Sequence, residues 1–231
     1  MSFSLLEILE RELVKHYFMI NVVKNELRRV FPNVDIVHVG ELVQCRLKVL
    51  ALSQIGSEEE YFKAIRGRKV TPMFLGTIVE HGFRNIVKGR VKVLDHVIKF
   101  KKLTLPDMKN VVIVGSPDLV VEVDGKYIPV EVKWSISQAE LREHYEVQAK
   151  LYAWLFDSEE ARVVVFSPNG FAEYRVEAFS DKEVEQIYAD WLKKTPRWEW
   201  ECRYCSAAHT CTARTQEKRE QTTAKTIKTL T

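Results

Sequence analysis

The sequence lacks a long hydrophobic run, because its 231 residues contain no apolar stretch of about 18 residues, the length that a membrane-spanning helix needs. We therefore predict no membrane partner. The N-terminal stretch also lacks the uninterrupted apolar core of a signal peptide, because acidic residues interrupt its amphipathic pattern. These two absences indicate an intracellular, cytoplasmic protein.

The sequence also lacks an excess of charge of either sign. It has 35 Lys and Arg against 32 Asp and Glu, which gives a formal net charge of +3. Such a balance does not by itself indicate a nucleic-acid-binding protein, so any basic surface has to be local. An apolar fraction of 46% is enough for a core, and the length suits one large domain or a domain with an appendage.

Cysteine is scarce and unevenly placed. Cys202, Cys205 and Cys211 form a C-x2-C-x5-C cluster, whereas Cys45 lies far away in sequence. Structural disulfides are rare in a reducing compartment. Thiolates are soft ligands that suit an iron–sulfur cluster or zinc, and structural zinc sites usually pair two local C-x2-C knuckles. The spacing therefore favours iron–sulfur, with His209 as a possible substitute ligand. Either metal would tie the N-terminal part of the chain to its C-terminus.

The hydrophobic pattern predicts an α/β protein with a mixed β-sheet flanked by helices. Residues 1–90 form an N-terminal helical region, with helix-like apolar spacing over 40–54, 58–67 and 72–89. Residues 91–194 form the α/β core, residues 195–211 a cysteine cap, and residues 212–231 a polar, disordered tail. Predicted strands are 91–105, 110–123, 126–134, 161–168 and 172–179, and predicted helices are 138–157 and 181–194.

A hairpin signal brings two carboxylates together. Asp124-Gly125 between alternating strands indicates a two-residue turn, which places Asp118 opposite Glu131 on one face, with Cβ atoms roughly 4.5–5.5 Å apart. Two carboxylates that close repel each other, and a divalent cation such as Mg²⁺ or Mn²⁺ compensates well. Lys133 shares the face, and its ammonium could orient a nucleophilic water or stabilise charge on a phosphate.

The plain alternative is a solvent-facing strand with a Glu–Lys pair, because E-x-K alone is a weak signal. The run 111–121 counts against it, since it is apolar on both faces and indicates a buried sheet. A buried acid pair needs a compensating partner. Pro129 argues against this register, because proline has no N–H group to donate to a strand ladder.

These residues resemble the PD-(D/E)XK core of RecB-like nucleases. The segment "GSPD" is followed by "EVK", thirteen residues after the Asp. The resemblance implies that Asp118 and Glu131 bind the metal ion together with the backbone carbonyl of Val132. It also implies that Lys133 assists phosphodiester hydrolysis.

RecB-like members also carry an upstream histidine on a helix, and "EHG" offers His81. On a helical wheel His81 lies opposite the main apolar side of its helix. That apolar side consists of Leu75, Val79, Gly82 and Ile86. His81 is thus either a metal ligand, as the resemblance implies, or an ordinary surface histidine.

The family's Q-x-x-x-Y motif corresponds to "QAKLY", with Gln148 and Tyr152. Their i, i+4 spacing puts both on one helix face, which is predicted to pack on the sheet. They are either a satisfied polar pair in the core or groups that orient the active site or the DNA backbone. His144, one turn earlier, stays unassigned.

The cysteines extend the resemblance. Together with the short chain and "GELVQCRLK", their arrangement is similar to that of the CRISPR-associated exonucleases, the fourth of the numbered Cas proteins, over roughly residues 36–211. The resemblance implies a [4Fe–4S] or sometimes [2Fe–2S] cluster on Cys45, Cys202, Cys205 and Cys211. It further implies Mg²⁺- or Mn²⁺-dependent cutting of single-stranded DNA, commonly from the 5′ end. The implied role is trimming fragments for a CRISPR array with Cas integrase proteins as partners, and a homo-oligomer stays open.

Two other functions fit the same motifs. One is a non-catalytic DNA-binding or scaffold subunit of an adaptation complex, against which the intact Asp, Glu and Lys argue. The other is a stand-alone DNA repair exonuclease, which the sequence does not separate from the CRISPR role. Four basic residues could form a local DNA track, with a solvated face as the alternative: Arg84, Lys88, Arg90 and Lys92.

Overall fold

The computed structural model describes residues 19–55, 57, 59–60, 70–95, 97–107, 109–193, 196–205, 207 and 211. Residues 19–30 are helical. The elements that follow are β1 (Asp35–His38), α2 (Val39–Leu42), α3 (Arg46–Ser53), α5 (Val70–Lys88), β2 (Lys92–Leu94), β3 (Lys99–Thr104), β4 (Asn110–Gly115), β5 (Leu119–Val123), β6 (Lys126–Trp134), α6 (Glu143–Leu155), β7 (Glu160–Ser167), β8 (Gly170–Glu177), α7 (Asp181–Leu192) and the short 3₁₀-helix η1 (Glu201–Tyr204).

The strands described form two sheets. One has the order β1-β4-β3, and the other has the order β2-β5-β6-β7-β8. The parallel pair β6–β7 is joined through α6, whereas β5–β6 and β7–β8 are antiparallel hairpins. The α/β class with mixed sheets and flanking helices is therefore confirmed. The run 110–123, predicted as one strand, breaks at Ser116-Pro117, and its halves β4 and β5 belong to different sheets.

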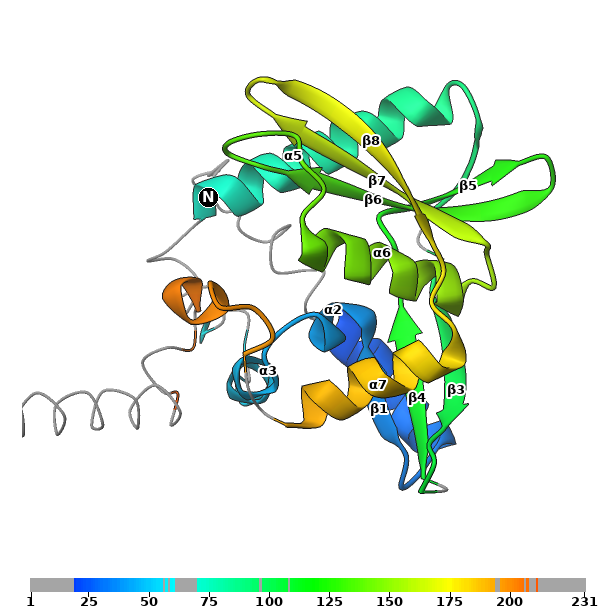
Figure 1. The fold of residues 1–231 in the computed structure, drawn as a ribbon, viewed down its shortest axis with the longest axis vertical. Coiled ribbons are helices and arrows are strands. Elements are labelled where there is room, and N and C mark those ends of the chain that lie inside the picture. Colours follow the sequence, from blue (N-terminus) through cyan, green and yellow to red (C-terminus); the bar gives the residue numbers. More distant parts are fainter. Residues whose placement is uncertain are drawn as a thin grey trace, which may run out of the picture.

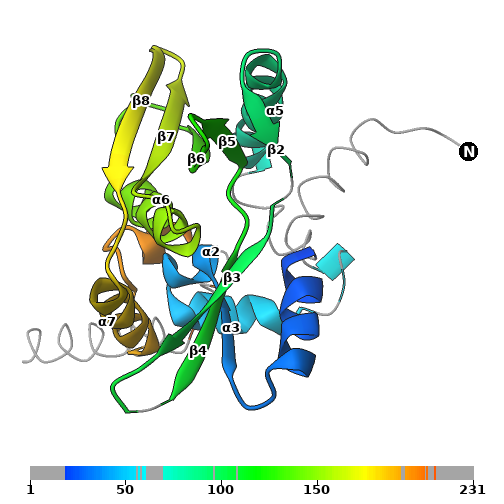
Figure 2. The same ribbon diagram turned by 90° about the vertical axis from the view of Figure 1, so that its right-hand side faces the viewer.

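Two helices sandwich the five-stranded sheet (Figures 1 and 2). Successive strand residues face opposite sides. Val164 packs with Val79 of α5, whereas its neighbours Val163 and Val165 pack with alanines of α6. α5 and α6 therefore cover opposite faces, and α6 lies between the two sheets, where it also contacts β3 and β4.

Part of the predicted N-terminal helical region is a strand. Residues 35–38 form β1, which pairs in parallel with β4 and is buried except at Asp35. The helix predicted over 40–54 is two helices, because Cys45 adopts an extended ψ of 126° between α2 and α3. The helix predicted from residue 138 begins at Glu143. The tail 212–231 and most of 58–67 lie outside the described residues.

The apolar side predicted for α5 is right at Val79 and wrong at Leu75 and Ile86. Val79 and Phe83 pack on the sheet, whereas Leu75 and Ile86 are 37% and 71% exposed. The sheet-facing side therefore also carries Glu80, one residue after Val79. This rotation decides which polar residues of α5 reach the opening of the carboxylate site described below.

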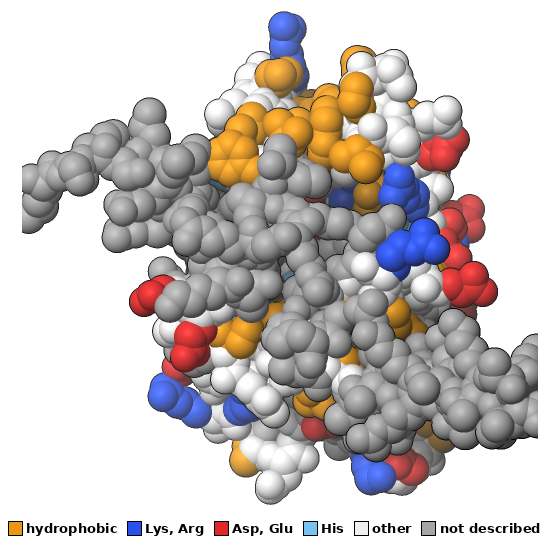
Figure 3. Space-filling view, turned by 90° about the vertical axis from the view of Figure 1, so that its left-hand side faces the viewer, with side chains coloured by type: hydrophobic (Ala, Val, Ile, Leu, Met, Phe, Trp, Pro, Cys, Tyr) orange, Lys and Arg blue, Asp and Glu red, His pale blue; other side chains and the backbone are white. Residues whose placement is uncertain are grey.

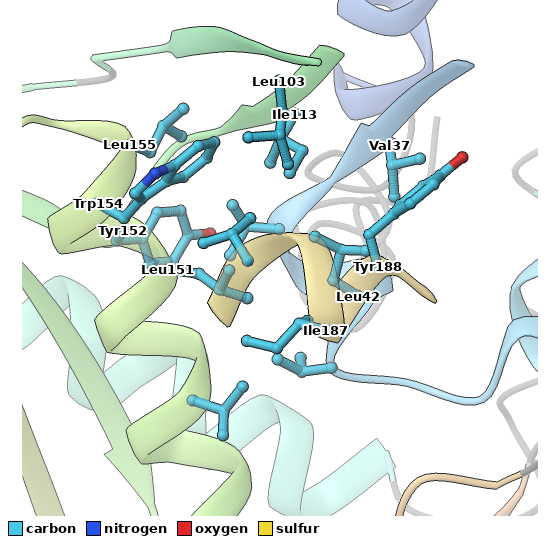
Figure 4. Close-up of a cluster of buried hydrophobic side chains, with 14 of the residues drawn as sticks. Val37, Leu42, Leu103, Ile113, Leu151, Tyr152, Trp154, Leu155, Ile187 and Tyr188 are labelled. Carbon is cyan, nitrogen blue, oxygen red and sulfur yellow. The ribbon is translucent and has the colours of Figure 1, made fainter. Parts of the chain in front are cut away.

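The main core lies between α6, α7 and the three-stranded sheet (Figure 4). Leu151 and Leu155 of α6 are fully buried there against Ile113 of β4. α7 begins at Asp181 after a capping box between Ser180 and Glu183, which satisfies amide groups of its first turn. This core fixes α6 beneath the sheet that carries the hairpin.

The face of the molecule drawn in Figure 3 has charges of both signs and an apolar area at its top. Figure 3 shows apolar side chains gathered where α5 and the five-stranded sheet form the top of the molecule. The exposed apolar residues of α5 and β8 include Ile78, Ile86 and Phe171. Among the helices described, none has both the length and the apolar character to cross a membrane.

Gly115, at the end of β4, tests how tightly α6 is docked. A Cβ atom there would lie 2.7 Å from Tyr152 Cε1 and 2.9 Å from Val39 Cγ2, so Gly115→Ala should destabilise the protein by about 1–3 kcal/mol. Gly82→Ala is the matched control, because nothing lies within 4 Å and alanine favours a helix by up to about 1 kcal/mol. Urea unfolding measures both. Equal stability of Gly115→Ala and wild type would contradict this packing.

Candidate active site

The predicted hairpin register is confirmed. Asp124 and Gly125 have φ values of 51° and 76°, the left-handed values that a two-residue type I′ turn requires. The ladder ends with Leu119 opposite Val130, in the predicted alignment. Pro129 does not distort this register, because the ladder from β6 to β7 begins one residue later, at Val130.

Asp118 lies just beyond that ladder, and its side chain, instead of a backbone carbonyl group, accepts the hydrogen bond from β6. Its Oδ2 atom accepts a hydrogen bond of 2.7 Å from the N–H of Val132. Its own carbonyl oxygen accepts one of 2.6 Å from Arg84 Nη2 of α5. The N–H and C=O of one strand residue point to the same side, so the Val132 carbonyl also faces Asp118. The role of that carbonyl as a metal ligand stays a prediction.

Glu131 is a buried carboxylate, and one of its two oxygen atoms has no hydrogen-bond partner among the described residues. The residue is 1% exposed, and Oε2 forms an ion pair with Lys133. The other oxygen, Oε1, is buried and has no hydrogen-bond partner among the described residues. Burial, and then Asp118, raises the pKa of Glu131 above its ordinary value, although Lys133 opposes the rise. A divalent cation fits here, because it would supply both the missing charge and a partner for Oε1.

Glu80 of α5 is a third carboxylate at this place, and the sequence reasoning missed it. Burial, and then Asp118, raises the pKa of Glu80 to about 7. Its Oε1 atom also forms a 2.8 Å ion pair with Arg84 Nη2. The available signal was the i, i+4 pair of Glu80 and Arg84, which follows the sheet-facing Val79 and Phe83 by one residue each.

His81 and the basic residues near it lie at the surface or in ion pairs. His81 is exposed, so its metal-binding role stays a prediction. Three of the four basic residues are engaged in ion pairs rather than left for phosphates. These pairs are Arg84–Glu80, Lys88–Asp95 and Lys92–Glu122. Arg84 instead holds the main chain of Asp118 in place.

The Q-x-x-x-Y pair of α6 lies beneath the carboxylates. Tyr152 is 2% exposed, and burial, and then Glu131 and Asp118, raises the pKa of its hydroxyl group, to which Gln148 hydrogen-bonds. Tyr152 is thus a buried hydroxyl group with a polar partner, and the role of the pair in orienting the active site stays a prediction. Burial, with repulsion from Lys133 and Arg142, lowers the pKa of the half-buried His144 to about 4.

The four cysteines gather around one cavity. Cys45, Cys202, Cys205 and Cys211 line it together with Glu201 and Lys48, and η1 lies beside α3 in Figure 1. A set of four thiols is a soft donor set that fits an iron–sulfur cluster or zinc. Within the described ranges, however, no three His, Cys, Asp or Glu side chains are close enough to hold a metal ion as they stand. His209 lies outside the described residues.

Contacts between protein groups already hold this cap together. Glu201 is 6% exposed, and its carboxylate accepts 2.6 Å and 3.0 Å hydrogen bonds from the N–H groups of Cys45 and Arg197. Trp198 Nε1 donates a buried 3.0 Å hydrogen bond to the carbonyl oxygen of Val43. The N-terminal and C-terminal parts of the cap are therefore joined by hydrogen bonds between segments more than 150 residues apart.

Comparison with known proteins agrees with this arrangement. The PD-(D/E)XK nuclease superfamily matches residues 19–212. A Saccharolobus solfataricus protein described as CRISPR-associated exonuclease Cas4 is 29% identical over 184 residues, which cover 77% of this chain and 88% of the relative. The crystal structure of SSO0001 matches with a TM-score of 0.73 at 24% identity, covering 90% of this chain and 96% of the other, and shows the same fold. An alkaline exonuclease from Laribacter hongkongensis matches at 14% identity with a TM-score of 0.42, covering 68% of this chain and 84% of the other.

The chain belongs to the PD-(D/E)XK nuclease superfamily, and it is accordingly a phosphodiester hydrolase of a superfamily that uses divalent metal ions. The resemblance to the CRISPR-associated exonucleases is confirmed by the Saccharolobus relative.

The raised pKa of Glu80 gives the metal-free protein a pH-dependent stability. The pKa of Glu80 is about 7 in the folded protein and 4.5 ordinarily, so the folded state binds this proton more tightly. The resulting stabilisation is fully present below pH 4.5 and is lost as pH rises through 7. Without divalent metal, wild type should lose more unfolding free energy between pH 5 and pH 8 than Glu80→Gln, which cannot ionise. Urea unfolding in a chelating buffer measures this, with the exposed Glu199→Gln as control. The same pH slope for wild type and Glu80→Gln would contradict the burial of a charged Glu80.

Proposed function

We propose that this protein is a metal-dependent exonuclease that degrades single-stranded DNA from the 5′ end. The observation that carries the proposal is the buried Glu131 carboxylate, whose Oε1 lacks a partner among the described residues beside Asp118. The Saccharolobus relative, whose printed description is an exonuclease, supports this class of activity.

The chain's own residues would divide the work as follows. Asp118, Glu131, Glu80 and the Val132 carbonyl are the groups that would hold Mg²⁺ or Mn²⁺, with His81 as a further candidate. When bound, such an ion polarises the scissile phosphate and lowers the pKa of a bound water.

Lys133 supplies the positive charge from the protein. Burial by itself would lower the pKa of Lys133, but Glu131 and Asp118 raise it further, so the net direction is upward. Lys133 therefore stays an ammonium group while the carboxylates lack a metal ion. It is suited to stabilising negative charge that develops on the phosphate, rather than to removing a proton.

We also propose that Cys45, Cys202, Cys205 and Cys211 hold an iron–sulfur cluster, [4Fe–4S] in preference to [2Fe–2S]. Their convergence on one cavity supports the proposal, as does the soft character of four thiolates. Burial, with a contribution from the nearby Glu201 and Cys205, raises the pKa of Cys45, so metal binding would have to displace its proton.

The biological setting that fits this activity is the trimming of DNA fragments for a CRISPR array, with Cas integrase proteins as partners. The printed description of the Saccharolobus relative as CRISPR-associated supports this setting. Co-purification with the integrase would distinguish it from a stand-alone repair exonuclease. DNA binding without cleavage would instead favour a scaffold subunit.

Removal of the Glu131 charge tests the nuclease site. Glu131→Gln keeps the side-chain shape but weakens metal binding, so cleavage of end-labelled linear single-stranded DNA with Mn²⁺ should fall by more than about 100-fold, since outer-shell partners of a metal alone typically cost 10–100-fold. Circular single-stranded DNA should resist wild type, as an exonuclease requires. Undiminished cleavage by Glu131→Gln would place the reaction elsewhere.

The same assay separates the two α5 candidates. Glu80→Ala should lower the rate and raise the Mn²⁺ concentration needed, because Glu80 faces Asp118. His81→Ala tests the predicted histidine ligand on the same helix. If His81→Ala lowers the cleavage rate and Glu80→Ala does not, His81 is a metal ligand and Glu80 is not.

Glu201 tests the cysteine cap. Glu201→Ala leaves the buried N–H of Cys45 without its acceptor, which should destabilise the cap by roughly 1–3 kcal/mol and lower the iron bound per chain. Glu199→Ala, two residues away and exposed, is the control. Iron analysis and visible absorbance measure the effect. Purified wild type that contains zinc and no iron would overturn the iron–sulfur proposal.

A further inference from the structure

An aromatic cluster connects the cysteine cap with Lys133. His144 and Tyr145, at the start of α6, have ring centroids 4.1 Å apart. His144 also contacts Trp200 at 4.8 Å and Trp198 at 6.1 Å, and both tryptophans belong to the segment that leads to Cys202. At the other end, Lys133 Nζ lies 5.9 Å from the centroid of the Tyr145 ring.

The two tryptophans in this cluster differ in their surroundings. Trp198 is 8% exposed, and its Nε1 donates to the carbonyl oxygen of Val43, so it anchors the segment. Trp200 is 43% exposed. Packing of the cap therefore uses only part of the Trp200 ring. Trp200 leaves much of its ring open to solvent, next to His144.

The exposed charges around these rings are of both signs, with Glu143 and Glu199 on the acidic side and Arg142 on the basic side. Arg142, the residue before α6, is exposed and lies beside Ser135 and Ser137, to whose hydroxyl oxygens its guanidinium donates 3.2 Å hydrogen bonds. The positive end of the α6 dipole lies at the same place. With its lowered pKa, His144 is neutral near pH 7, so its ring can stack without carrying charge.

We propose that Trp200, His144 and Tyr145 form a base-stacking platform that holds unpaired bases of the DNA strand next to Lys133. This inference rests on the proposed function and adds how the single strand is recognised. Bases of a single strand expose their ring faces, whereas those of a duplex are already stacked on one another. The platform would therefore favour single-stranded over double-stranded DNA without reading sequence. Because Trp200 directly precedes Glu201 and Cys202, the position of the cap sets the position of the platform.

Binding of a fluorescein-labelled oligothymidylate, measured by anisotropy in a chelating buffer that prevents cleavage, tests the platform. A stacked base is worth about 1–3 kcal/mol, so Trp200→Ala should raise Kd by about 5- to 150-fold. Trp200→Phe should retain most of the affinity, because it keeps an aromatic face. Phe171→Ala, which removes a 76% exposed aromatic ring from β8, should leave Kd unchanged.

An oligonucleotide of abasic sites separates stacking from a structural effect of the substitution. Wild type should bind the abasic strand more weakly than oligothymidylate, and Trp200→Ala should bind both alike, at an iron content equal to that of wild type. Equal binding of both strands by wild type, with cleavage intact, would overturn the platform and leave the proposed function standing. Wild type that neither binds nor cleaves single-stranded DNA would overturn both.

Discussion

Glu131 is a carboxylate with almost no access to water, and it shares its surroundings with two more carboxylates, Asp118 and Glu80. Burial of like charges is unfavourable, and two cations, Lys133 beside Glu131 and Arg84 beside Glu80, face the three carboxylates. The neighbouring structure is arranged around this constraint. The hairpin fixes the register of Glu131, the Val132 N–H holds the carboxylate of Asp118, and Arg84 holds its backbone. Such a charge deficit is what a divalent cation relieves.

The site depends on a break in the sheet. β4 and β5 are separated by only three residues, yet they belong to different sheets. Because of the break, the backbone pairing of β5 with β6 ends at Val130. The N–H of Val132 therefore donates its hydrogen bond to the side chain of Asp118, and α5 can approach from one face. Gly115, the last residue of β4, lets α6 pack closely at this break, because any larger residue would collide with Tyr152 of α6.

The cap and the carboxylate site are physically connected through α6. Its first turn carries His144 and Tyr145, which contact the C-terminal tryptophan segment and Lys133, and its middle carries Tyr152 beneath the carboxylates. Glu201 and Trp198 join that segment to the N-terminal part of the cap. A cluster on the cysteines would therefore stabilise the same segment that places Trp200 against His144 at the start of α6.

The sequence alone determined the hairpin. Asp124-Gly125 and strict alternation fix a register, so the positions of Asp118, Glu131 and Lys133 followed from local rules, and the C-x2-C-x5-C spacing indicated a metal-binding cap. Tertiary structure decided the rest. The five-stranded sheet selected which side of α5 faces inward, which brought Glu80 close to Asp118, and β1 became a strand only by pairing with β4. Helix orientation and strand pairing between distant segments depend on packing across the whole core, and no local pattern encodes them.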